Sequence, residues 1–300
     1  MKSVGLPQDP LWPRANILFD GSTAAADFAL LGIPAHQTSI SATSAHLTPA
    51  AVRELISRYS TYSGSKNIDL QQLSMADLGD IESPDGIDGQ LRVSQFVNGL
   101  LSKHKLLVGL GGDNSISYSL CAGLWPDLSN IGIITFDAHH DLRDGDTNGS
   151  PIWKLIQKGV PGKNIVQIGL SDFANSRAYT DRAKEAGITI IYRSELRGRN
   201  ISDVVKGALD IAGAGGREIF VDIDVDVCDR SVAPACPASV PGGITADEIR
   251  CAAFEVAADH RVRAIDITEI DAAMDAPDQR TLRLAALLVL EIATGLASRS

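Results

Sequence analysis

The amino-acid sequence predicts one α/β domain with three layers, in which helices cover both sides of a mostly parallel, doubly wound sheet of about eight strands. Short runs rich in Val, Ile and Leu alternate with helix-like stretches along the 300 residues. Several runs are continuously apolar, which is typical of strands buried on both faces. No Pro/Gly/Ser-rich linker divides the chain, so we expect a single domain over residues 1–300, with 1–25 as a loose N-terminal arm.

Eight strands are expected from the apolar runs, at 28–33, 75–78, 106–109, 132–137, 164–168, 189–193, 218–224 and 263–269. Seven helices are expected between and after them, at 49–62, 93–104, 115–124, 175–186, 202–211, 246–258 and 280–297. Two starts are marked clearly, because Thr48 precedes a first-turn proline and Thr245 forms a capping box with Glu248. The last helix takes its apolar side from a series of leucines at 282, 284, 287, 288 and 290.

Composition excludes several classes of protein. The formal net charge of −10 disfavours a nucleic-acid partner. The longest apolar run, 284–294, is interrupted by Glu291 and falls short of the roughly 18 residues that span a bilayer. The N-terminus has no apolar stretch typical of a secretory signal. The four cysteines contain no CxxC pair and indicate reduced thiols in a cytoplasmic protein without membrane partners; they are Cys121, Cys228, Cys236 and Cys251.

Acidic groups, an asparagine and a histidine follow four of the predicted strands. They are Asp113 and Asn114 after 106–109, Asp137, His139 and Asp141 after 132–137, Asp224 and Asp226 after 218–224, and Glu269 at the end of 263–269. In sheets of this kind, ligands bind beyond the carboxyl ends of the strands, where the loops converge. We therefore expect these side chains to meet at one edge of the sheet.

The spacing of these residues predicts a metal site. Asp137, His139 and Asp141 recur at spacing two, as do Asp222, Asp224 and Asp226, and this period places each set on one side of an extended chain. Crowded carboxylates either take raised pKa values or bind cations. An oxygen-rich set with one imidazole suits Mn²⁺ or Mg²⁺ better than Zn²⁺, and two such ions can share and ionise a water.

Other interpretations of these residues remain open. A single Asp-x-Asp at a strand end is more often a capped turn than a metal site. Asp222 lies one step deeper than Asp224, so support of the ligands and direct ligation are both possible for it. His140 lies off the ligand side and is expected to be a packed histidine.

Four ordered motifs resemble the ureohydrolase family of arginases, agmatinases and formimidoylglutamases. They are GGDNS at 111–115, DAHHD at 137–141, DVDVCD with APACPASVPGG over 224–243, and the strand that ends in Glu269. TPAAVR at 48–53 is similar to a helix start of that family. The resemblance covers residues 31–293 and implies an arginase-like fold. It also implies a homotrimer or homohexamer that acts on a small-molecule substrate.

The resemblance implies two Mn²⁺ ions per chain, with Asp137, His139, Asp141, Asp224 and Asp226 as ligands. The sixth ligand of the family is a histidine, where this sequence has Asn114. A neutral amide oxygen should weaken that metal position. A second departure is Asn148, because arginases and agmatinases have a histidine there, to which proton transfer is assigned.

Both departures resemble bacterial formimidoylglutamases, which hydrolyse N-formimidoyl-L-glutamate to L-glutamate and formamide. On this hypothesis, Asp141 takes the proton of the attacking water and Glu269 pairs with the amidinium nitrogens. Arg143 binds a substrate carboxylate, and Asn148 and Ser150 add neutral hydrogen bonds to the same end. The alternative for Arg143 is a surface cation paired with Asp144 or Asp146. The alternatives for the protein are an agmatinase or guanidinobutyrase, or a catalytically silent member of the family.

Overall fold

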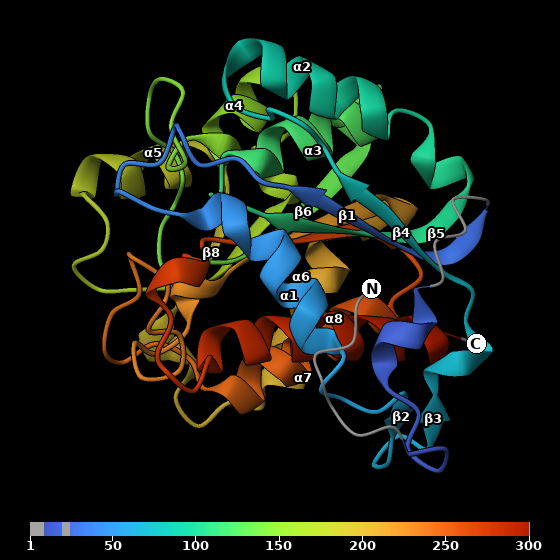
Figure 1. The fold of residues 1–300 in the computed structure, drawn as a ribbon. Helices are drawn as coiled ribbons and strands as arrows, with labels where there is room; N and C mark the ends of the chain where they lie inside the picture. Colours follow the sequence, from blue (N-terminus) through green and yellow to red (C-terminus); the bar gives the residue numbers. More distant parts are fainter. Residues whose placement is uncertain (1–8, 20–24, 300) are drawn as a thin grey trace.

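The computed structural model describes residues 9–19 and 25–299, which form three layers around one sheet (Figure 1). The sheet has the order β4-β1-β5-β10-β9-β6-β7-β8, and each of its strand pairs is parallel. Its strands are β1 (Ala26–Ile33), β4 (Met75–Asp80), β5 (His104–Gly111), β6 (Ile131–Phe136), β7 (Ile165–Leu170), β8 (Thr189–Tyr192), β9 (Glu218–Asp224) and β10 (Val262–Thr268). All eight predicted strands are present, and the predicted fold class is confirmed.

Helices cover both faces of the sheet, as the doubly wound prediction requires. One face packs against α1 (Thr48–Ile56), α6 (Ile201–Ala212), α7 (Ala246–Ala258) and α8 (Arg280–Ala297). The opposite face packs against α2 (Gly86–Val97), α3 (Ile116–Leu124), α4 (Pro151–Lys158) and α5 (Arg177–Ala186). Every residue of β6 and β7 is buried, which explains why these strands read as continuous apolar runs.

Two helix predictions need correction, and one helix was not predicted. The helix expected at 93–104 is α2, which begins at Gly86 and ends at Val97. The first turns of α2 contain Gly86 and Gly89, and the sequence did not predict a helix there because glycine is a poor helix former. A Cβ on Gly89 would lie 2.2 Å from the carbonyl carbon of Pro84, so the glycine permits a close approach there. The helix expected at 49–62 ends at Ile56, and α4 was not predicted although Pro151 begins it.

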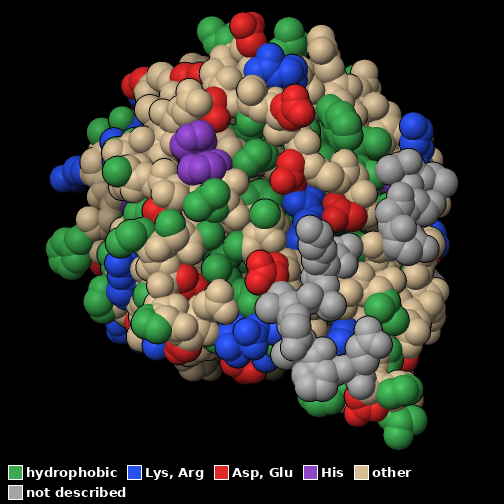
Figure 2. All heavy atoms as spheres, viewed as in Figure 1, with side chains coloured by type: hydrophobic (Ala, Val, Ile, Leu, Met, Phe, Trp, Pro, Cys, Tyr) green, Lys and Arg blue, Asp and Glu red, His purple; other side chains and the backbone are tan. Residues whose placement is uncertain are grey.

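The surface and the N-terminal region complete the fold. Of the predicted N-terminal arm, residues 1–8 and 20–24 lie outside the described residues, while η1 (Ala15–Leu18) buries Ala15 and Leu18 in the core. A small antiparallel pair, β2 (Tyr62–Ser63) and β3 (Ile68–Asp69), projects from the domain. Acidic and basic side chains are mixed on the face shown in Figure 2. No helix in the described part of the chain combines the length and the apolarity that crossing a bilayer demands.

Gly112 follows β5 and packs closely against Ala35, in the loop that follows β1. A Cβ on this residue would lie 1.8 Å from the carbonyl oxygen of Ala35, which accepts the N–H of Asp113 at 2.8 Å. We therefore expect Gly112→Ala to lower the free energy of unfolding by about 3 kcal/mol. Urea unfolding measures this loss. Gly207→Ala is the matched control, since Gly207 lies in α6 with open space around it and should tolerate alanine. Equal stability of the two variants would contradict the predicted clash.

Candidate metal centre and active site

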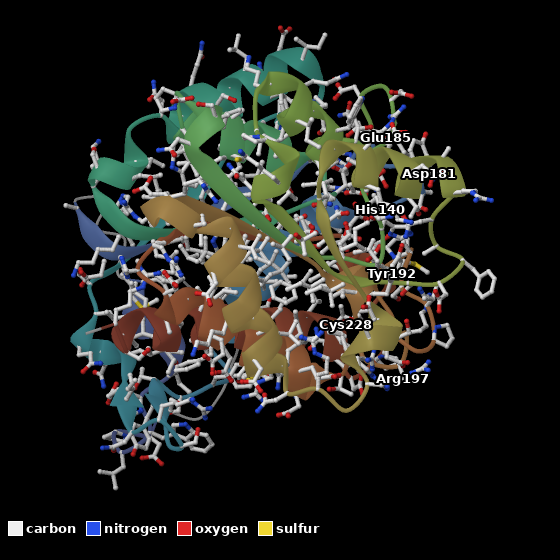
Figure 3. The ribbon with its side chains drawn as sticks, turned by 180° about the vertical axis from the view of Figure 1, so that it is seen from behind. His140, Asp181, Glu185, Tyr192, Arg197 and Cys228 are labelled. Carbon is white, nitrogen blue, oxygen red and sulfur yellow. The ribbon has the colours of Figure 1, made fainter. Side chains whose placement is uncertain are left out.

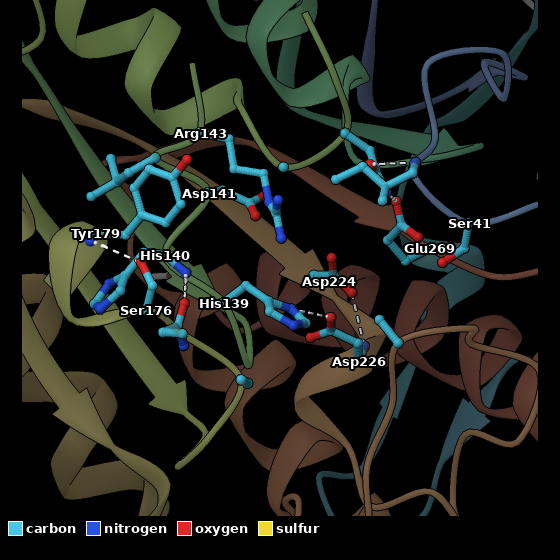
Figure 4. Close-up of a pocket in the computed structure, with 17 residues that line it drawn as sticks. Ser41, His139, His140, Asp141, Arg143, Ser176, Tyr179, Asp224, Asp226 and Glu269 are labelled. Carbon is cyan, nitrogen blue, oxygen red and sulfur yellow. Dashed lines mark hydrogen bonds and ion pairs between the residues drawn. The ribbon is translucent and has the colours of Figure 1, made fainter. Parts of the chain in front are cut away.

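A cavity of about 380 Å³ opens at the carboxyl edge of the sheet (Figure 4). Loops that follow β1, β6, β7, β9 and β10 supply its walls. Most of the predicted site residues line it, namely His139, Asp141, Arg143, Asn148, Asp224, Asp226 and Glu269. Side chains from distant parts of the sequence thus meet at the edge where the sequence placed them.

Asp137, His139 and Asp226 form a group of possible metal ligands, of which His139 and Asp226 line this cavity. One ligand atom from each residue lies within 4.8 Å of the other two. The Nδ1 atom of His139 is 2.6 Å from Oδ2 of Asp226 and 3.6 Å from Oδ1 of Asp137. Asp137 Oδ2 is buried and has no hydrogen-bond partner among the described residues. A buried oxygen in that state is suited to a cation.

The electrostatics of this group call for positive charge. Burial raises the pKa of Asp137 well above its usual value, and the carboxylates of Asp141 and Asp226 raise it further. Burial also raises the pKa of Asp224 well above its usual value, again with Asp226 adding to the shift. Burial lowers the pKa of His139, but Asp226 and Asp137 outweigh this effect, so that the pKa rises to about 12. The carboxylates therefore favour positive charge at His139, and a divalent cation bound beside the imidazole would supply that charge in place of the proton.

Asp141 and Glu269 share an unusual backbone conformation at the site. Their φ angles are +53° and +65°, in the left-handed region that residues with a Cβ rarely adopt. Burial raises the pKa of Asp141, and although His139 opposes this the net pKa is about 7. Burial and the nearby carboxylate of Asp113 raise the pKa of Glu269 to about 8. Both groups can therefore exchange protons near neutral pH.

Asn114 turns its amide nitrogen, rather than its oxygen, toward the carboxylates. Its Nδ2 donates to Asp141 Oδ2 at 2.6 Å, while its Oδ1 accepts the hydroxyls of Ser117 at 2.8 Å and Thr268 at 3.0 Å. Ligation of a metal by the oxygen requires the amide to rotate and to give up both hydroxyl contacts. The assignment of Asn114 as a sixth ligand stays a prediction.

Glu269 is held from two directions. Its Oε1 accepts the backbone N–H of Asn114 at 2.7 Å and the side-chain amide of Asn148 at 2.8 Å. Its own N–H donates to the carbonyl oxygen of Gly112 at 2.9 Å. These contacts leave Oε2 available for a substrate. Asn148, predicted as a substrate-binding residue, lies at the cavity wall but is engaged with Glu269.

Arg143 lines the cavity and has no ion-pair or side-chain hydrogen-bond partner in the described part of the chain. Both acids that could have made it a surface cation are paired elsewhere. Asp144 pairs with Arg182 at 3.0 Å, and Asp146 pairs with Lys154 at 2.5 Å. The structure thus leaves the guanidinium of Arg143 free to bind a ligand.

Ser150 is placed differently from the other predicted substrate-binding residues. It is fully buried and is not part of the cavity lining. Its hydroxyl lies 3.0 Å from that of Thr147, within the turn that precedes α4. Ser150 is therefore not exposed to the cavity in this structure, and its role in substrate binding stays a prediction.

His140 is a packed histidine, as expected. Its ring nitrogens lie 2.7 Å from Gln167 Oε1 and 3.2 Å from the hydroxyl of Thr180. Seen from behind in Figure 3, it lies inward of α5, whose Asp181 and Glu185 face outward. His140 therefore fixes the loop rather than offering a free ligand atom.

Sequence reasoning considered Asp222 as a support or a ligand, but it missed the pairing of Asp222 with Asp266 and part of the cavity wall. Asp222 and Asp266 are opposite one another on β9 and β10, and both are fully buried. The hydroxyl oxygen of Ser117 lies 2.7 Å from Asp266 Oδ2, so its single proton is shared between Asp266 and Asn114, while both oxygens of Asp222 lack a donor among the described residues. An aspartate inside each apolar strand was the available signal. Tyr179 and Ser176 at the cavity wall had no comparable signal, since they belong to an ordinary loop and helix start.

The arginase family model matches residues 26–295 of this sequence. The chain belongs to the arginase family. The formimidoylglutamase of Halalkalibacterium halodurans is 34% identical over 282 residues, which cover 91% of this chain and 88% of that protein. The agmatinase of Bacillus subtilis is 28% identical, over 90% of this chain and 92% of that protein.

Solved structures of the arginase family share this fold. The formimidoylglutamase of Bacillus subtilis superimposes with a TM-score of 0.92 at 31% identity, over 100% of this chain and 97% of that one. The formiminoglutamase of Trypanosoma cruzi, determined with two Mn²⁺ ions, has a TM-score of 0.88 at 23% identity, over 96% of this chain and 100% of that one. The eight-stranded parallel sheet between two helical layers is therefore the arginase-family architecture.

The residues of this arginase-family chain fit divalent cations. The unpartnered oxygen of Asp137 and the raised pKa values of the buried carboxylates both disfavour the cluster without added positive charge. Carboxylate oxygens with one imidazole nitrogen form a donor set that Mn²⁺ accepts. Asp137, His139 and Asp226 could hold one ion, with Asp141 and Asp224 beside them.

Supplying Mn²⁺ to metal-depleted protein is expected to stabilise the fold. The carboxylates repel one another when no cation lies between them, so the depleted protein should unfold at a lower temperature. At free Mn²⁺ of about 100 times Kd, the expected gain is about 2.7 kcal/mol. Scanning calorimetry with and without Mn²⁺ measures it, and KCl at the same ionic strength is the control, because a monovalent salt adds screening without a divalent ligand for the carboxylates. An unchanged Tm would contradict a metal centre in this cavity.

Proposed function

We propose that this arginase-family protein is a Mn²⁺-dependent formimidoylglutamase, which hydrolyses N-formimidoyl-L-glutamate to L-glutamate and formamide. The observation that supports this substrate is the unpaired guanidinium of Arg143 at the wall of a cavity whose floor is acidic. The substrate carries its formimidoyl group on the α-nitrogen, next to the α-carboxylate, and its γ-carboxylate lies at the far end. A cavity with a cation at one side and carboxylates at the other complements both ends.

The two ends of the substrate have different partners in the cavity. Arg143 offers a planar fork of donors that pairs with a carboxylate through two hydrogen bonds. Glu269 Oε2 accepts N–H groups of the formimidoyl end, since Oε1 is already engaged by Asn114 and Asn148. In Figure 4 the side chains of Arg143 and Glu269 come from different loops and point toward the same space above Asp224 and His139. This arrangement orients the formimidoyl carbon over the acidic floor.

The chain's own groups then handle the protons of hydrolysis. Two divalent ions, held by Asp137, His139, Asp141, Asp224 and Asp226, would act as Lewis acids and lower the pKa of the attacking water. Asp141 accepts a proton from the water whose oxygen adds to the formimidoyl carbon. Asp141 then returns the proton to the glutamate nitrogen as its bond to carbon breaks. Glu269 keeps the remaining nitrogen in place, and this nitrogen leaves as part of formamide.

A substrate panel with the Mn²⁺-loaded protein tests the proposal. We expect release of equal amounts of glutamate and formamide from N-formimidoyl-L-glutamate, and no urea from agmatine or guanidinobutyrate. Chelated protein is the control and should be inactive. Urea release from a guanidine, without turnover of formimidoylglutamate, would overturn the proposed substrate.

Two alternatives predict other outcomes of the same panel. An agmatinase would need acids, not Arg143, near the positive end of its dicationic substrate, so the free guanidinium counts against it. A silent family member would release no product and would bind less than one Mn²⁺ per chain. The homotrimer or homohexamer, the cytoplasmic location and the lack of nucleic-acid or membrane partners stay predictions from the sequence.

A further inference from the structure

We propose that the turn at residues 147–150 positions both polar ends of the active site. In this turn Asn148 sets the orientation of Glu269, and the neighbouring Gly149 sets that of Arg143. The inference deepens the proposed function and rests on it, because it states how one short segment controls both the reacting end and the carboxylate end of the substrate. It assigns Asn148 and Gly149 as positioning residues rather than as substrate contacts.

The turn itself is closed and anchored. The N–H of Ser150 donates to the carbonyl oxygen of Thr147 at 3.1 Å, and the two hydroxyls of these residues lie 3.0 Å apart. Asn148 and Gly149 are therefore the two central residues of a β-turn. Pro151 follows at the first position of α4, which fixes the exit of the turn. A segment constrained at both ends holds its central side chains in one orientation.

Asn148 has one orientation available to its amide. Its Oδ1 accepts the N–H of Ile40 at 3.0 Å, and its own N–H donates to the carbonyl oxygen of Thr38 at 3.2 Å. Because Oδ1 is engaged, Nδ2 points at Glu269 and donates to Oε1 at 2.8 Å. The carboxylate of Glu269 is thereby oriented with its second oxygen free. Asn148 thus also ties the loop that follows β1 to Glu269.

Gly149 provides space for Arg143. A Cβ on residue 149 would lie 2.7 Å from Cδ and 3.0 Å from Nε of Arg143. The backbone N–H of Arg143 also donates to the carbonyl oxygen of Gly149 at 2.9 Å. The φ angle of Gly149 is not in the left-handed region, so the glycine is needed for space and not for its backbone conformation. Any side chain at 149 must displace the stem of Arg143, because that stem is more flexible than the turn.

Substitutions at Asn148 and Gly149 should therefore change different kinetic parameters. Asn148→Asp keeps the shape but removes the donor and places a second carboxylate against Glu269, so kcat should fall about 100-fold with little change in KM. Gly149→Ala should move the guanidinium and raise KM for N-formimidoyl-L-glutamate about tenfold with kcat nearly unchanged. KM for N-formimidoyl alkylamines without carboxylates should not change in this variant.

Matched substitutions control for general effects. Asn98→Asp adds the same charge at the exposed end of α2, and Gly207→Ala adds the same methyl group in α6 where space is open. Both controls should keep the wild-type kcat and KM. A purely structural role of the turn would instead lower kcat and Tm together in both test variants, without the split between kcat and KM.

Crystal structures and a double-mutant cycle test the contacts without relying on activity. The Gly149→Ala structure should show Arg143 displaced and the turn unmoved, and the Asn148→Asp structure should show Glu269 rotated. The stability cost of Gly149→Ala should disappear in an Arg143→Ala background, since the clashing atoms are then absent. These results support the inference even if formimidoylglutamate proves not to be the substrate, an outcome that would overturn the proposed function alone. An unmoved Arg143, an unmoved Glu269 or an equal stability cost in both backgrounds overturns the inference.

Discussion

Replacing Asp226 by asparagine is expected to remove turnover almost completely, with kcat lowered by about 10³-fold or more. Asp226 lies at the centre of the acidic cluster, because Oδ2 is 2.6 Å from His139 Nδ1 and Oδ1 accepts the N–H of Ala138 at 2.9 Å. Asparagine cannot keep both contacts and also supply negative charge. The ion held with Asp137 and His139 should therefore be lost together with activity.

Metal content and kinetics together check this result. Elemental analysis of the purified variant should find less Mn²⁺ per chain than in the wild-type protein, and excess Mn²⁺ should not restore kcat. Asp181→Asn is the control, since Asp181 is exposed on α5 and forms an ion pair with Arg177 at 3.9 Å, far from the metal group. If Asp226→Asn retained its metal and its activity, the assignment of Asp137, His139 and Asp226 as the metal group would be wrong.

Replacing Arg143 by methionine is expected to raise KM for N-formimidoyl-L-glutamate by about 100-fold. Methionine keeps the length of the side chain but not the charge, so the carboxylate of the substrate loses its only free cationic partner in the described cavity lining. Arg143→Lys should have an intermediate effect, because lysine keeps the charge without the planar fork. Steady-state kinetics on formimidoylglutamate and on carboxylate-free formimidoyl amines separate carboxylate binding from catalysis.

A uniform loss on both kinds of substrate would give Arg143 a role in the reaction itself. An unchanged KM would leave carboxylate recognition to another residue of the cavity wall, with Tyr179 the first candidate. The proposed substrate, by contrast, is rejected only by the product analysis of the wild-type protein.

The strands could be predicted from the sequence because burial on both faces leaves a strong local signal. β6 and β7 are buried along their whole length, and their apolar runs reveal this directly. The helices were harder where local signals conflict. Glycines at the start of α2 suggest a loop, although packing against Pro84 makes a glycine necessary there. Eight residues in α4 are too few for periodicity to be obvious.

Some features of the candidate site could also be predicted from local sequence patterns, whereas others depend on contacts between distant segments. The ligand side of Asp137, His139 and Asp141 follows from the period of an extended chain, which is a local property. The contacts of Asn148 with Glu269 and of Gly149 with Arg143 join loops that are distant in the sequence. The facing pair Asp222 and Asp266 depends on the strand order, in which β9 lies beside β10. No local pattern contains that order, so these contacts could not be derived from the sequence.

The left-handed φ angles of Asp141 and Glu269 have a consequence for the evolution and engineering of this protein. Each angle costs a residue with a Cβ about 1–2 kcal/mol, whereas glycine adopts it freely. Glycine at either position would also remove a buried acid. At 269 the gain is offset, because glycine would leave the N–H of Asn114 and the amide of Asn148 without their acceptor. Heat-tolerance screening without an activity requirement should therefore enrich glycine at 141 more than at 269, and it should yield stable but inactive proteins. Libraries for thermostability should hold both codons constant.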